Sequence, residues 1–153
     1  MMVQVPESLS FEQAIAQTQQ LIAARINQEI DAQHFAQGVQ ALVQSENGAR
    51  GFFVTYLTWE DDRADQPDEF LIQALASSPE IVSELLVKNL AMSTAMGITH
   101  RRNQDEAMAQ GSDRVQRRTQ TLMQRLNLPQ IANKAQELFR NAGGEPGPYS
   151  EFL

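Results

Sequence analysis

The sequence predicts an all-α fold, a single compact helical domain of about five to seven helices covering residues 1–153. Apolar residues recur at helical spacing in nearly every segment, and residues typical of helix starts precede these segments. No second convincing strand is present to pair with the one strand-like segment. A chain of this size buries roughly two-thirds of its unfolded surface, which suffices for one core. Non-helical termini are expected at 1–9 and 145–153.

Two helices are predicted in the first third of the chain. Ser10 and Gln13 have the spacing of a capping box, so the first helix begins near Ser10 and runs to about Gln28. Asp31 is the expected N-cap of the second helix, which we predict to end at residues 47–48, an Asn-Gly pair. Two antiparallel helices joined by a short turn follow from this pattern.

Residues 51–59 are rich in β-branched and aromatic side chains, which favour a strand by local propensity. A lone strand would leave its backbone groups unpaired, so we predict a buried helix; the alternative is a strand that pairs across a homodimer. The large apolar side chains of this segment and of the tail are candidate subunit-interface residues: Phe52, Phe53, Tyr56, Trp59, Tyr149, Phe152 and Leu153.

A long, buried central helix is predicted near residues 80–101, after a short helix at Pro67–Ala76. Ser78 and Pro79 fit the N-cap and the first helical position, and apolar residues surround much of the circumference. Its length is about 33 Å at 1.5 Å per residue. Charged residues such as Glu84 and Lys88 interrupt the apolar run, so we expect a buried helix and no membrane contact.

The remaining chain predicts a polar connection, two more helices and a docked tail. Residues 103–111 form the connection, and Ser112 is the expected cap of the next helix. A turn at 127–129 leads into the last helix, which ends at 141–144. Two prolines prevent the tail from continuing this helix, and its three large apolar side chains favour docking onto an apolar surface.

Composition excludes several kinds of chemistry. The chain has no cysteine, which excludes disulfides, thiolate zinc sites, iron–sulfur clusters and cysteine nucleophiles. No nucleophile elbow, phosphate loop or dinucleotide motif is present, and neither of the two histidines completes a Glu-x-x-His motif, the nearest spacing being Asp31 to His34. We therefore predict no catalytic residues, no metal and no cofactor. The net charge of −7 argues against nucleic acid. The first ten residues lack a secretory pattern, so a cytoplasmic location is expected.

Basic residues flank the predicted connection and form a candidate anion site. His100, Arg101 and Arg102 end the long helix, whereas Arg114, Arg117 and Arg118 lie near the start of the next. Guanidinium groups that converge beside a helix N-terminus bind anions. The alternative, which we favour, is structural. Residues 1–80 carry a net charge of −9 and residues 81–153 one of +2, so the arginines of the later helix would pair with the acidic first half.

Three function classes remain open. The first is a non-enzymatic protein-interaction or regulatory helical module that self-associates, with a protein partner or a second copy as its ligand. The second is a binding domain for a small anionic or phosphorylated ligand that uses the arginine cluster, and the third is an enzyme of unknown class. Four methionines, which can line an adaptable binding groove, are interpreted here as core filler: Met92, Met96, Met108 and Met123.

Overall fold

The computed structural model describes residues 9–149. Within this range the chain forms seven α-helices and one 3-10 helix, with no strand, so the predicted all-α class is confirmed. The elements are α1 (Phe11–Ile26), α2 (Ala32–Leu42), α3 (Glu46–Tyr56), η1 (Asp62–Asp65), α4 (Glu69–Ala76), α5 (Pro79–Arg102), α6 (Glu106–Leu126) and α7 (Pro129–Ala142).

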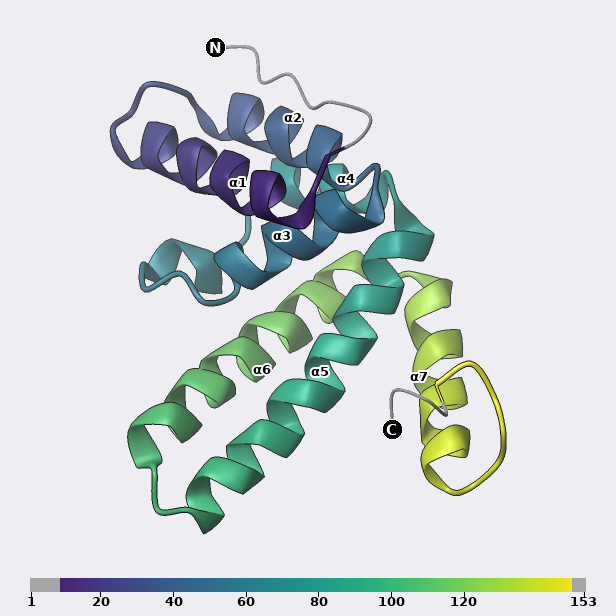
Figure 1. The fold of residues 1–153 in the computed structure, drawn as a ribbon. Coiled ribbons are helices and arrows are strands. Elements are labelled where there is room, and N and C mark those ends of the chain that lie inside the picture. Colours follow the sequence, from purple (N-terminus) through teal and green to yellow (C-terminus); the bar gives the residue numbers. More distant parts are fainter. Residues whose placement is uncertain (1–8, 150–153) are drawn as a thin grey trace.

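The helices are arranged as an N-terminal bundle and a projecting hairpin (Figure 1). In the bundle, α1 packs against α3 and α2 packs against α4. Helices α5 and α6 run antiparallel and extend away from the bundle, and α7 packs on the other side of α5. Helix α5 is therefore the central helix, although only its first half reaches the bundle.

Several helix starts were predicted correctly because the signal is local. The Ser10 hydroxyl accepts a hydrogen bond from the backbone N–H of Gln13 at 3.1 Å, and the Gln13 side chain accepts one from the backbone N–H of Ser10 at 2.9 Å. This reciprocal pair is the predicted capping box. Asp31 caps α2 by accepting from the backbone N–H of His34 at 2.8 Å, and Pro79 is the first residue of α5.

The predicted end of the second helix at residues 47–48 is wrong. Helix α2 ends at Leu42, and Ser45 caps α3 by accepting from the backbone N–H of Gly48 at 3.1 Å. Gly48 thus lies in the first turn of α3, and a Cβ there would lie 1.9 Å from the carbonyl oxygen of Leu42, so glycine permits this tight turn. The strand-like segment after it continues as α3 to Tyr56, which confirms the helix prediction.

The predicted starts of two helices, α6 and α4, are also wrong. Helix α6 is capped by Asp105, which accepts from the backbone N–H of Met108 at 3.2 Å, so Ser112 lies inside the helix. The polar connection is only three residues long because Gln104 adopts a left-handed conformation with φ of 59° and reverses the chain at once. Helix α4 begins at Glu69 after its cap Asp68, two residues later than predicted.

Burial divides α5 into two halves. Val82, Leu86 and Val87 are buried in the core that the bundle forms, whereas Met92 and Met96 in the second half are 48% and 45% exposed. The prediction of a buried helix is therefore correct only for the first half, because the bundle ends there. Among the described residues, α5 is the one helix long and apolar enough to cross a membrane, a criterion that the core helix of a soluble protein also meets.

Candidate functional site

The structure disperses the six basic residues of the candidate anion site. Arg101 turns back onto α6, where it donates to Asp113 at 2.5 Å and to Glu106 at 3.4 Å. The Asp113 carboxylate raises the pKa of Arg101 and has its own pKa lowered in return. Arg117 and Arg118 contact the acidic first half of the chain. Arg102 is exposed, which leaves His100 and Arg114 as the two members that line one common hollow.

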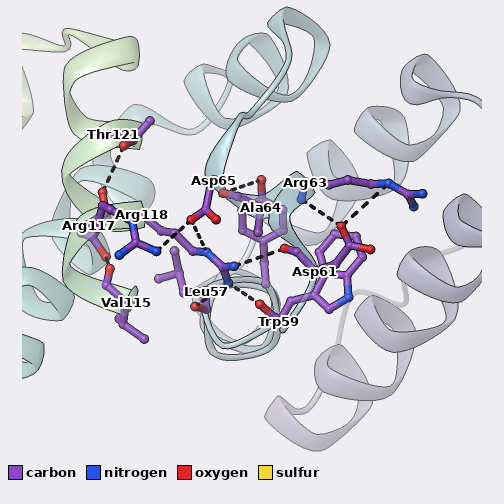
Figure 2. A network of polar contacts seen from close by, with 12 residues as sticks. Leu57, Trp59, Asp61, Arg63, Ala64, Asp65, Val115, Arg117, Arg118 and Thr121 are labelled. Carbon is purple, nitrogen blue, oxygen red and sulfur yellow. Dashed lines mark hydrogen bonds and ion pairs between the residues drawn. The ribbon is translucent and has the colours of Figure 1, made fainter. Parts of the chain in front are cut away.

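Arg118 lies buried between α6 and the chain that follows α3. Figure 2 shows its guanidinium group pointing from α6 into this segment. It donates to the Asp65 carboxylate at 2.9 Å, to the carbonyl oxygens of Leu57 and Asp61 at 3.1 and 3.2 Å, and to the carbonyl oxygen of Trp59. The side chain is only 1% exposed. A planar fork with several donors suits such a set of acceptors, which a lysine cannot match.

Arg117 contacts the same carboxylate from outside. It is 60% exposed and lies 3.4 Å from Asp65, so water screens this second ion pair. The hydrogen bond from Arg118 is the main cause that lowers the pKa of Asp65, while partial burial opposes it. Together these contacts attach α6 to the end of α3 and to η1 (Figure 2). The Arg118 cluster therefore holds the hairpin against the bundle.

The aromatic candidates of α3 belong to the core of this chain. Phe52, Phe53 and Tyr56 are at most 2% exposed, and the rings of Phe52 and Tyr56 stack at 5.1 Å. Burial raises the pKa of Tyr56. Trp59 is partly buried and packs against the same core. Three of these four side chains are thus inaccessible to a second subunit, because the bundle already covers them.

The described part of the tail docks onto α5. Tyr149 is buried, and its hydroxyl donates to the Glu84 carboxylate at 2.8 Å. Its backbone N–H donates to the side chain of Asn141 at 2.9 Å, which folds the chain back against α7. Burial and the adjacent carboxylate both raise the pKa of Tyr149. Phe152 and Leu153 lie outside the described residues.

A hollow of about 460 Å³ lies where α3 faces the exposed half of the hairpin. Met92 and Met96 of α5 and Met108 of α6 line it, and Val54 and Val115 add further apolar surface. It shares Val54, Met92 and Val115 with a second hollow of about 360 Å³ that reaches Phe11 of α1. We call the two continuous hollows the methionine groove. Its volume is in the range of natural binding sites.

The interpretation of the methionines as core filler is wrong for three of the four. Met92, Met96 and Met108 are 48%, 45% and 54% exposed, whereas Met123 packs against the core. Exposed methionines close together cost free energy in water unless something covers them, and their flexible side chains adapt to varied apolar partners. The methionine groove is therefore the best candidate for a functional site.

Basic side chains surround the methionine groove. Arg50 lies over the ring of Phe11 at 4.8 Å, and neither Arg50 nor Arg114 forms an ion pair with any residue in the described range. Lys88 also lines the groove but pairs with Glu84 at 3.4 Å. The one acidic residue in the lining is Glu46. In a protein of net charge −7, this surface is locally basic.

A comparison with models of protein families shows to which family the chain belongs. One family model matches residues 10–153. The chain belongs to the family described as Uncharacterised conserved protein UCP020893. No curated protein and no solved structure matches it. The family description names no activity, so function is argued from the groove and the residues around it.

The favoured pairing of the later arginines with the acidic first half is confirmed for Arg117 and Arg118 and not for Arg114, but sequence reasoning missed the burial of Arg118 and the groove. Arg118 lies three residues after Val115 and four before Leu122. This helical spacing already placed it on the same face of α6 as these apolar residues. Its partners lie more than 50 residues away and gave no local signal. The groove had a weak signal in Met92 and Met96, one helical turn apart. No group of metal-ligating side chains was found among residues 9–149.

Proposed function

We propose that this member of the family is a non-enzymatic protein-interaction module that holds an apolar segment of a partner in the methionine groove. The observation that carries the proposal is the set of three methionines, each about half exposed, on two adjoining helices. Neighbouring apolar side chains left open to water at one hollowed surface are typical of sites that a partner covers.

The polar groups around the groove support binding more than catalysis. His100 is the one histidine in the groove lining, and histidine is the side chain most often used as a general acid or base. No hydrogen bond joins its ring to another side chain in the described part of the chain. Nucleophilic catalysis pairs the nucleophile with a base within hydrogen-bond reach. The groove therefore offers apolar area and scattered charge, which are the means of recognition.

The proposed interaction surface is the methionine groove, in place of the aromatic side chains of α3 that the sequence suggested. Phe52, Phe53 and Tyr56 stabilise the monomer as core residues, and of the three only Phe53, 1% exposed, lines the smaller hollow. Self-association through the methionine groove stays one form of the proposed function, because a second copy is also a protein partner.

A small anionic ligand is the second candidate function. It is favoured by His100 and Arg114, two of the predicted anion-site residues, which line the same hollow as the methionines. Such a ligand would need an apolar body as well as an anionic group. Phosphate or sulfate alone would make no use of the three methionines.

Gly111 allows a direct test of the proposed function. It lines the groove on α6, and a Cβ there would have no heavy atom within 4 Å. Gly111→Leu therefore fills the groove without a clash at Cβ, and leucine is a better helix former than glycine. Gln110→Leu is the matched control, because Gln110 is exposed on the same helix and does not line the groove.

The experiment is a selection of displayed random peptides that bind the immobilised full-length protein. We expect the enriched peptides to be apolar along one side, to bind the wild type and Gln110→Leu equally, and to lose binding to Gly111→Leu. Circular dichroism should show the same helix content for all three proteins. A selection in which no enriched peptide distinguishes Gly111→Leu from the wild type refutes the proposed function.

A further inference from the structure

We infer that the segment held in the methionine groove is an amphipathic α-helix of another protein, with acidic side chains along both edges of its apolar face. This inference rests on the proposed function and specifies the chemistry of the partner. It follows from the length of the groove, its open form and the distribution of charge around it.

The groove has the length of a short helix. Its lining on α5 extends from Leu85 to His100, which is about 22 Å at 1.5 Å per residue. A partner helix of about 15 residues has this length and presents apolar side chains at i, i+3, i+4 and i+7 along it. Residues of α3, α5 and α6 line the groove, and both hollows are open to solvent, so a helix can lie in it without threading through the protein.

The apolar floor suits a helical partner of variable sequence. Met92, Met96 and Met108 bring flexible, polarisable side chains that repack around different aliphatic groups. Val54 and Val115 lie where the two hollows meet and are part of both. The floor thus continues from one hollow into the other, as contact with successive turns of a helix requires.

Charge at the edges favours an acidic partner. Arg50 of α3 and Arg114 of α6 line the groove, so charged basic groups come from two of the three helices, and His100 of α5 lines it as well. Arg50 and Arg114 form no ion pair within the described range, in contrast to Arg101, whose charge is balanced by Asp113. Asp or Glu residues beside the apolar face of a partner helix would complement these groups.

The spread of these groups favours a helix over a small anion. Arg50 lines the hollow near α1, whereas His100 lines only the hollow near the tip of the hairpin. A single phosphate or carboxylate group would need several donors converging on one point. A helix carries charges at intervals along its length, and that distribution corresponds to the spacing of the basic residues.

The test uses two fluorescein-labelled 15-residue peptides and the full-length protein. Both peptides carry leucines at the same apolar positions, and the edge positions are glutamate in one peptide and glutamine in the other. Glutamate and glutamine have similar helix propensities, so helix content stays comparable and is checked by circular dichroism. Binding is measured by fluorescence anisotropy at low and high salt.

We expect the glutamate peptide to bind about tenfold more tightly than the glutamine peptide at low salt, as a few exposed ion pairs produce. High salt and the double variant Arg50→Gln/Arg114→Gln should each remove most of this difference. Gly111→Leu should abolish the binding of both peptides, whereas Gln110→Leu should leave it unchanged. The wild-type comparison of the two peptides tests the inference even if the double variant fails to fold.

Equal affinity of the two peptides overturns the inference and leaves the proposed function standing. If neither peptide shows binding that Gly111→Leu abolishes, both the inference and the proposed function are overturned. Two parallel titrations identify other occupants. Groove-dependent binding of dodecanoate without peptide binding would assign the site to an anionic amphiphile. Sedimentation velocity that shows a dimer of the wild type but not of Gly111→Leu would assign it to a second copy of the chain.

Discussion

Replacement of Arg118 by methionine tests the most constrained polar group in the structure. Methionine keeps much of the aliphatic stem of arginine, so packing changes little, but all donors of the guanidinium group are lost. The Asp65 carboxylate then loses its nearest cation, and the carbonyl oxygens of Leu57, Trp59 and Asp61 lose the hydrogen bonds that they accept.

The expected decrease in the free energy of unfolding is about 3–5 kcal/mol, the range found when one partner of a buried ion pair is removed. Each buried acceptor left without a donor costs about 1–3 kcal/mol. Water reaches Asp65 in part, since its side chain is 28% exposed, and this holds the total below the simple sum. Arg117→Met is the matched control, because Arg117 contacts the same carboxylate from solvent, and its loss should cost about 0–1 kcal/mol.

The assay is urea unfolding at pH 7, followed by far-ultraviolet circular dichroism and by the fluorescence of Trp59, the one tryptophan of the chain. The Trp59 carbonyl accepts a hydrogen bond from Arg118, so its ring also reports local release of this segment. A decrease below about 1 kcal/mol, or one equal to that of Arg117→Met, would refute the argument, since the energy expected for an exposed pair is of that size.

The pH dependence of stability gives a second measure of the same cluster. Because the folded state lowers the pKa of Asp65 from its usual value of 3.8, the ionised carboxylate stabilises the fold. This contribution is complete above pH 3.8 and is lost as the pH falls from there through the lowered pKa of the folded state. Arg118→Met should flatten this part of the stability profile. An unchanged acid limb would contradict the assignment.

Two further predictions concern glycine and the tail. Gly51→Ala should destabilise the protein by about 1–3 kcal/mol, because the new Cβ would lie 2.3 Å from that of Ala14, whereas Gly111→Ala should stabilise it by about 0.5–1 kcal/mol. Equal shifts in the urea midpoint for the two variants would show that the close approach of α1 to α3 does not restrict the side chain at position 51. Tyr149→Phe removes the hydrogen bond to Glu84 and should cost about 1 kcal/mol; an unchanged midpoint would mean that the tail does not contribute to stability.

Local signals in the sequence determined the fold class and most helix starts. Ser10 and Asp31 cap helices as predicted, because their partners lie three residues away. Segment 51–59 was assigned to a helix by the lack of a second strand, and α3 agrees. The start of α6 was missed because the chain reverses at Gln104 through a positive φ, which residue type alone does not reveal.

The candidate site depended on contacts that only the tertiary structure decided. Arg118 is buried because α6 crosses the end of α3, where carbonyl oxygens more than 50 residues away accept its hydrogen bonds. Met92 and Met96 have the same helical spacing as core residues, and they are exposed because the bundle covers only the first half of α5. Helical periodicity shows which residues share a face of a helix. Whether that face is covered depends on where the other helices end, and this is a property of the folded chain.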